Sequence, residues 1–122
     1  MKLFESEQKV MEVLWRKGEM SAKEISKYLS EEIGWNKNTT YTVIKKCITK
    51  GAIERKEPGF LCKPLIQRDD FESYEIKEVL EKAFKGSKLG FFSAFLENEN
   101  LSKKDLEEIE ALIREKKEKN AD

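Results

Sequence analysis

The sequence contains no histidine, which removes the commonest general base and the commonest metal ligand of proteins. Its two cysteines, Cys47 and Cys62, have no second pair beside them, so the usual spacing of a zinc site is missing. Glycine-rich phosphate-binding motifs are missing as well. We therefore expect neither an enzyme nor a catalytic residue, and we expect no cofactor and no metal site.

The sequence also lacks a long hydrophobic run. Its longest nearly apolar stretch, Leu89 to Leu96, covers eight residues, which is too short to span a bilayer. No signal peptide precedes the first expected helix, and two unpaired thiols suit a reducing compartment. These features predict a cytoplasmic protein that is not inserted in a membrane.

The charges are balanced in number but not in position. The 24 basic and 24 acidic residues give a net charge of zero. Residues 1–66 nevertheless hold 13 basic and 9 acidic residues, whereas residues 67–122 hold 11 and 15. A basic half suits a polyanionic partner, and the acidic half then has a different role. We therefore expect a DNA-binding domain over residues 1–66 and a dimerisation domain over residues 67–122.

Three helices are predicted in the basic half. Apolar residues at helical spacing indicate a first helix over residues 5–16. Ser21 and Glu24 have the spacing of a capping box, which begins a second helix. Asn36 is the expected N-cap of a third helix, and Gly51 is suited to end it. The short turn between the second and third helices predicts a helix-turn-helix.

A β-hairpin is predicted directly after the third helix. Residues 52–55 and 60–63 have the composition of two short strands, and the Lys-Glu-Pro-Gly sequence between them is typical of a turn. Three helices followed by a hairpin indicate a winged helix-turn-helix. The expected fold class is therefore mainly α-helical, with a small β-hairpin wing and a C-terminal three-helix domain.

The third helix carries the clearest sign of function. Residues 35–51 contain four lysines and no acid. A helical wheel gathers its apolar side into one stripe, formed by Thr40, Val43, Ile44, Cys47 and Ile48. The opposite face presents hydroxyl, amide and ammonium groups, which suits the phosphates and base edges of a DNA groove. The predicted DNA contacts are Lys37, Asn38, Thr39, Tyr41, Thr42, Lys45 and Lys46, with Lys56 of the wing.

Some of these assignments have an alternative. Tyr41 lies at the edge of the apolar stripe, so it can equally flank the core. Lys45 and Lys46 can be solvated surface charges rather than phosphate contacts. In the wing, Lys63 is a weaker candidate than Lys56 for contact with phosphate.

The acidic half is predicted to form three helices and a dimer. Helical patterns cover residues 70–84 and 88–97, and Ser102 with Asp105 begins a last helix. A segment of roughly 50 residues is too short to bury its many Phe and Leu side chains alone. A symmetric homodimer is the common solution, although these helices can instead fold back onto the basic half. The expected interface consists of Tyr74, Leu80, Phe84, Phe91, Phe92, Phe95, Leu106, Ile109, Leu112 and Ile113.

Several short motifs follow one another over nearly the whole chain. They are Glu7 with Val10-Met11 and Leu14-Trp15, the stretch opened by Trp35, Thr39 and Thr42, Lys50-Gly51, and Phe95-Leu96-Glu97-Asn98 with Leu101-Ser102. In this order and spacing they resemble the penicillinase-repressor family of bacteria. That family groups repressors of β-lactamase and methicillin-resistance genes with repressors of copper-ATPase operons.

The resemblance implies a homodimeric repressor of the antibiotic-resistance type, whose winged helix binds a palindromic operator in double-stranded DNA. In that branch of the family, a membrane sensor with a metalloprotease domain leads to cleavage of the repressor within its fifth helix. The cleaved Asn-Phe bond aligns here with Ala94-Phe95, so the Asn is missing. The wing also departs from the family, because Phe60 stands where a basic residue often follows the turn glycine.

Two other functions are compatible with the sequence. One is a winged-helix module that binds a protein rather than DNA, which the net charge of zero and the weakly basic wing would suit. The other is a family repressor of a cation-ATPase operon, or of a different operon, that is not inactivated by cleavage. The cysteine-rich motif of the copper branch is missing, since neither cysteine lies in the last 60 residues.

Overall fold

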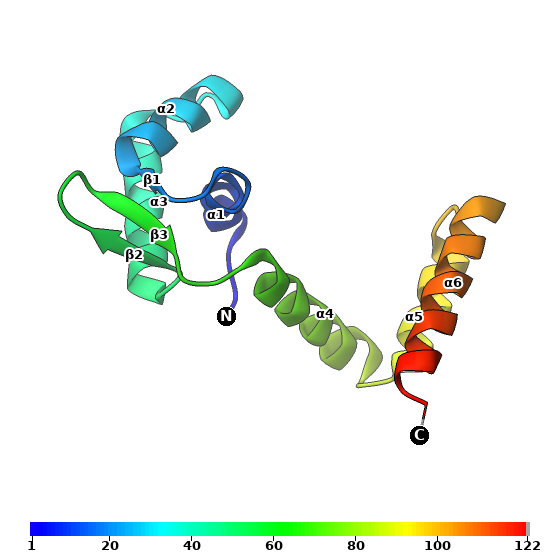
Figure 1. Ribbon diagram of the computed structural model, residues 1–122. Coiled ribbons are helices and arrows are strands. Elements are labelled where there is room, and N and C mark those ends of the chain that lie inside the picture. The colour runs from blue at the N-terminus through cyan, green and yellow to red at the C-terminus, as the bar shows by residue number, and fades with distance from the viewer. Residues whose placement is uncertain (122) are drawn as a thin grey trace. The chain divides into compact units, whose positions relative to one another are not determined.

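The computed structural model describes residues 1–121, whose helices and strands are drawn in Figure 1. The chain divides into two compact units, and the boundary between them lies between Glu78 and Val79. Unit 1, up to Glu78, begins with α1 (Glu5–Lys17), β1 (Met20–Ser21), α2 (Ala22–Ile33), α3 (Lys37–Lys50), β2 (Ile53–Lys56) and β3 (Leu61–Pro64). The next helix, α4 (Arg68–Phe84), begins in unit 1 and ends in unit 2. Unit 2 also contains α5 (Lys88–Asn98) and α6 (Lys103–Lys119).

The helices of unit 1 have the predicted caps. The Ser21 hydroxyl accepts the N–H of Glu24 at 3.1 Å, and the Glu24 carboxylate accepts the N–H of Ser21 at the same distance. The Asn36 side chain caps α3 by accepting the N–H of Thr39 at 2.8 Å. Gly51 ends α3 with φ at 83°, a left-handed conformation that suits glycine. The predicted helix-turn-helix is confirmed.

Three short strands form an antiparallel sheet in the order β1-β3-β2, and the turn between β2 and β3 projects away from the helices (Figure 1). The predicted hairpin is present, but each strand lies one residue later than expected. Ala52 continues the end of α3 instead, because its N–H donates to the carbonyl of Cys47 at 2.9 Å. The prediction missed β1, whose two residues are too few to show a pattern.

The core of unit 1 lies between α1, α2, α3 and the sheet. It consists of Leu3, Val10, Met11, Val13, Leu14, Ala22, Ile25, Leu29, Val43, Ile44, Cys47, Ala52, Ile53 and Cys62. Thr40 is also buried and Ile48 is partly buried, so the predicted apolar stripe of α3 faces this core. Burial raises the pKa of Cys47 to about 12 and that of Cys62 to about 11. Both thiols therefore stay protonated at neutral pH.

An ion pair between the buried Glu7 and the partly buried Lys50 joins the start of α1 to the end of α3. The Glu7 side chain is only 2% exposed, and its carboxylate accepts a hydrogen bond from the Lys50 ammonium at 2.6 Å. The same carboxylate accepts the N–H of Phe4 at 2.7 Å. Lys50 also donates to the carbonyl of Lys2 at 3.0 Å and lies 4.2 Å from the centre of the Phe4 ring. These contacts satisfy both charges inside the protein.

The first turns of α4 belong to unit 1 because they are attached to α1. Arg68 forms a two-pronged ion pair with Glu12, with N–O distances of 2.6 and 2.8 Å. The Trp15 indole donates to the carbonyl of Ile66 at 2.9 Å, and its ring lies 5.5 Å from that of Phe71. The boundary between the two compact units therefore lies inside α4, between Glu78 and Val79. The division of function between residues 66 and 67 stays a prediction.

In unit 2, α5 and α6 have well-capped starts, but no described side chain of the unit is fully buried. Ser87 caps α5, and Ser102 with Asp105 forms the predicted capping box before α6. No residue from Val79 to Ala121 is buried. Its most exposed large apolar side chains include Leu89, Leu112, Ile113 and Val79. One copy of these helices therefore forms no core of its own.

Replacing Lys50 by Met should destabilise unit 1 by about 2 kcal/mol, because the Met keeps the aliphatic stem and leaves the buried Glu7 carboxylate without its cation. Urea denaturation followed by tryptophan fluorescence measures this directly, since both tryptophans, Trp15 and Trp35, lie in unit 1. Lys9→Met is the control, because Lys9 pairs with the exposed Glu5 at 3.7 Å. That control should change stability by less than about 0.5 kcal/mol. Equal losses of unfolding free energy in the two variants would show that the pair of Glu7 and Lys50 stabilises the protein no more than the exposed pair does.

Candidate nucleic-acid interface

The outer face of α3 presents the predicted DNA-contacting residues to solvent. Packing of the opposite stripe against α1 and α2 fixes which side of the helix remains outside. The exposed residues are Lys37, Asn38, Thr39, Thr42, Lys45 and Lys46. No acid lies in the first turn, where the helix dipole adds a partial positive charge. This face can therefore accept anions and offers hydrogen-bonding groups between its ammonium groups.

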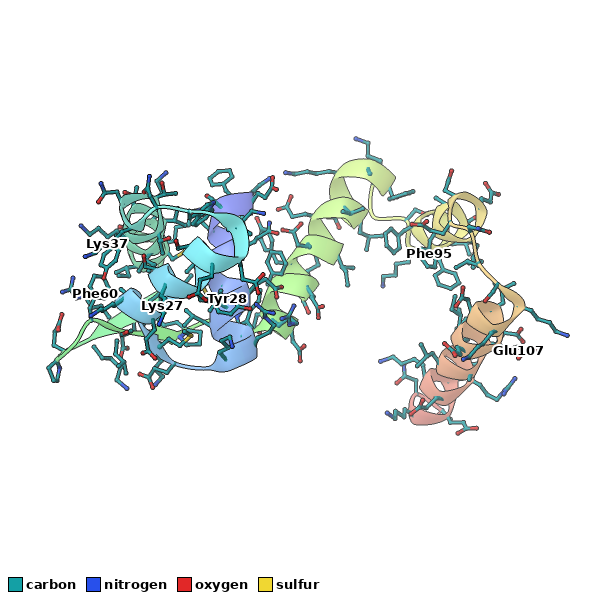
Figure 2. All side chains as sticks on the ribbon, turned by 90° about the horizontal axis from the view of Figure 1, so that it is seen from above. Lys27, Tyr28, Lys37, Phe60, Phe95 and Glu107 are labelled. Atoms are coloured by element: carbon teal, nitrogen blue, oxygen red, sulfur yellow. The ribbon has the colours of Figure 1, made fainter. Side chains whose placement is uncertain are left out.

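Tyr41 lies at the boundary between this face and the wing. Its ring is partly buried and packs edge to face against Phe60, with ring centres 5.8 Å apart. The Lys37 ammonium lies 5.6 Å from the centre of the same ring. Figure 2 shows Lys37 on α3 and Phe60 at the wing. The structure thus places Tyr41 in a packing role between α3 and the wing, and its contact with DNA stays a prediction.

A shallow hollow of about 530 Å³ lies beside the second half of α3. Its lining residues are Phe4, Glu7, Thr42, Lys45, Lys46, Thr49 and Lys50. Phe4 is 59% exposed although it is aromatic. The sequence did not predict that Phe4 lines this hollow, because Phe4 precedes α1 and belongs to no periodic pattern. Lys45 and Lys46 remain exposed here, whereas Lys50 is held by Glu7.

The wing carries two basic residues next to each other, and each is paired with an acid of the same chain. The Lys56 ammonium lies 3.1 Å from the carboxylate of Glu19, just before β1. Arg55 donates to the Glu57 carboxylate at 2.5 Å. Lys63, the weaker candidate, is exposed on β3. The sequence gives no sign of the pair between Lys56 and Glu19, which are 37 residues apart and are brought together by the sheet.

Glu57 is fixed in the turn of the wing by two donors. The hydrogen bond from Arg55 and that from the N–H of Phe60, at 3.2 Å, hold the pKa of Glu57 below its ordinary value. It is therefore charged at neutral pH. The Arg55 guanidinium also lies 3.6 Å from the centre of the Phe60 ring.

The ten residues predicted for a dimer interface all keep some exposure in one chain. Partly buried are Tyr74, Leu80, Phe84, Phe91, Phe92 and Ile109, and exposed are Phe95, Leu106, Leu112 and Ile113. The structure brings Phe92 of α5 together with Ile109, Leu112 and Ile113 of α6 around an apolar hollow of about 540 Å³. Lys116, Lys117 and Asn120 complete its lining. Tyr74 belongs to unit 1, on the first part of α4.

The bond between Ala94 and Phe95 lies within α5. The carbonyl of Ala94 accepts the side-chain amide of Asn98 at 2.8 Å. Phe95 is exposed on this helix (Figure 2). A protease that needs an extended substrate would therefore have to unwind α5 first.

The model of the family described as penicillinase repressor matches residues 3–115. The chain belongs to the penicillinase repressor family. This confirms the resemblance seen in the sequence motifs. The penicillinase repressor of Bacillus licheniformis is 28% identical over 115 residues, which cover 93% of this chain and 90% of that protein. The methicillin resistance regulatory protein MecI of Staphylococcus aureus strain N315 is 28% identical over 113 residues, covering 91% and 92%.

Two solved structures support the winged-helix fold. The DNA-binding domain of the repressor BlaI is 30% identical with a TM-score of 0.53, covering 57% of this chain and 87% of that domain. Monomeric Bacillus licheniformis BlaI in complex with the blaP half-operator is 29% identical with a TM-score of 0.51, covering 57% and 88%. The predicted fold class is thereby confirmed. Across residues 1–121, no helix is long and apolar enough to cross a membrane, and no group of three metal-binding side chains was found.

Proposed function

We propose that the protein is a transcriptional repressor that binds operator DNA as a homodimer, with α3 as its recognition helix. The observation that carries this proposal is the exposed, acid-free outer face of α3. The related BlaI, which has the same winged-helix fold, binds a half-operator. The function rests on this face rather than on the fold alone, because winged helices have several functions.

In the proposed complex α3 lies in the major groove of the DNA. Asn38, Thr39 and Thr42 lie near its N-terminal end and meet base edges, where Thr can also pack its methyl group on thymine. Lys37, Lys45 and Lys46 neutralise phosphates on either side. The base contacts give sequence specificity, and the phosphate contacts give an affinity that falls as salt rises.

The proposed dimer forms through unit 2. A second copy would cover apolar side chains that one chain leaves uncovered, including those around the hollow between α5 and α6. Two linked winged helices then bind two half-sites of a palindrome whose centres are about 10 bp apart, or a multiple of it. Because the two contacts are linked, separating the subunits would lower operator affinity steeply. The bound dimer would block polymerase by occupying the promoter.

The recognition helix is tested by two α3 variants on duplexes that the full-length chain selects from a random-sequence library. Thr42→Ala should weaken binding roughly tenfold by removing one base contact, and Lys45→Glu with Lys46→Glu should abolish it by repelling phosphates. Lys103→Glu with Lys104→Glu gives the same charge change in α6 of unit 2, outside the winged helix, and should retain binding. Gel-shift titration at several salt concentrations measures these effects.

Unchanged affinity in both α3 variants would show that α3 does not contact DNA. Binding by the native chain that does not weaken as salt rises would instead favour a module that binds a protein.

The dimer is tested by Phe91→Asp with Phe92→Asp, which places two carboxylates on the apolar side of α5. Sedimentation velocity should show monomers, because the buried charges would have no partners across the interface. Ser93→Asp, at an exposed position of the same helix, should remain dimeric. A persistent dimer in the double variant would place the interface elsewhere.

Inactivation by cleavage is the last part of the proposal. A break between Ala94 and Phe95 would separate α6 from the rest of the chain and remove much of the apolar surface available for pairing. The membrane sensor protease that the family resemblance implies would initiate it. Mass spectrometry of the chain from cells treated with a penicillin should then show a fragment ending at Ala94. An intact chain under conditions that relieve repression would rule out this step.

A further inference from the structure

The two adjacent basic residues of the wing are both neutralised within the chain. Successive side chains of a strand point to opposite faces, so Arg55 and Lys56 of β2 cannot share one acid. Glu57 lies 2.5 Å from Arg55, and Glu19 lies 3.1 Å from Lys56. The acids come from different parts of the chain, one from the turn of the wing and one from the segment before β1. On α3, by contrast, Lys45 and Lys46 have no such carboxylate beside them in the hollow, since Glu7 is held by Lys50.

We propose that Arg55 is a second phosphate-binding residue of the wing, and that Glu57 and Glu19 compete with DNA phosphates for Arg55 and Lys56. This inference rests on the proposed function of DNA binding. It assigns to the two carboxylates the role of setting the wing's share of the affinity.

The chemistry of the pairs permits this exchange. A phosphate offers a guanidinium the same pair of negative oxygens as a carboxylate does. Both ion pairs lie at the surface, with side-chain exposures of 46% and 57% for Arg55 and Glu57 and of 44% and 35% for Lys56 and Glu19. Surface pairs of this kind are weak. DNA can therefore displace the carboxylates, but it gains less from the wing than it would from unpaired cations.

The geometry also keeps the competitor in place. Glu57 accepts the N–H of Phe60, so its carboxylate stays in the turn beside Arg55. The Phe60 ring lies under the Arg55 guanidinium and restricts where that group can move. Phe60 in turn packs against Tyr41 of α3. These contacts attach the wing, and Arg55 with it, to the recognition helix. When α3 lies in the groove, Arg55 can therefore reach a phosphate beside that groove.

The test replaces each acid by its neutral amide in the full-length chain. Glu57→Gln retains an oxygen that can accept the N–H of Phe60, and Glu19→Gln has nearly the same size as the native residue. The probe is a fluorescent 40-bp duplex of random sequence, since phosphate contacts dominate non-specific binding. Anisotropy titrations should show binding about two- to fivefold tighter for each variant at low salt. The dependence of log K on log salt should steepen by about one for each additional phosphate that the wing neutralises.

Matched variants separate this effect from net charge alone. Glu54→Gln makes the same charge change at an exposed position of β2 and should tighten binding less, with no change in salt dependence. Adding Arg55→Gln to Glu57→Gln should remove the gain in affinity, which would show that it acts through Arg55. Thermal unfolding checks that each variant retains the native fold.

Three results would overturn the inference. Increases in affinity for Glu57→Gln and Glu19→Gln no larger than for Glu54→Gln would show that only net charge matters, and the proposed function would stand. Weaker binding in folded variants would show that the carboxylates support the DNA-binding form of the wing. If the native chain bound neither this duplex nor a selected one, the proposed function would fail together with the inference.

Discussion

The buried contact between Glu7 and Lys50 is the constraint on which the proposed binding face depends. It fixes the last turn of α3 to the first turn of α1, and it places a positive charge at the negative end of the α3 dipole. It also engages the one carboxylate that lines the hollow beside α3. The exposed lysines of that helix are consequently left for an external anion, while Glu7 stabilises the fold.

The two parts of the winged helix distribute their charges in opposite ways. At the end of α3, Lys50 pairs with the buried Glu7 of α1, whereas Lys37, Lys45 and Lys46 stay exposed. In the wing both adjacent cations face acids at the surface. The aromatic contact between Tyr41 and Phe60 joins these two parts. Affinity in the proposed complex would then come mainly from the helix, and the wing would contribute an adjustable amount.

Local signals in the sequence predicted most of the elements. Capping residues such as Ser21, Asn36 and Ser102 act over three or four positions, so the starts of their helices could be read directly. The period of α3 likewise separated its buried stripe from its exposed face. The contacts that were missed join distant residues: β1 with β3, Glu19 with Lys56, and Phe4 with the end of α3. No periodic pattern encodes such pairs, because the folded chain creates them.

The uncovered side chains of unit 2 have a consequence for the amount of protein in a cell. If α5, α6 and the end of α4 gain their core only from a second copy, their stability rises with the concentration of the chain. Freshly made chains at low abundance would expose these helices to proteases and be removed. Abundance would then act as a threshold, below which the chains are degraded and above which paired chains persist.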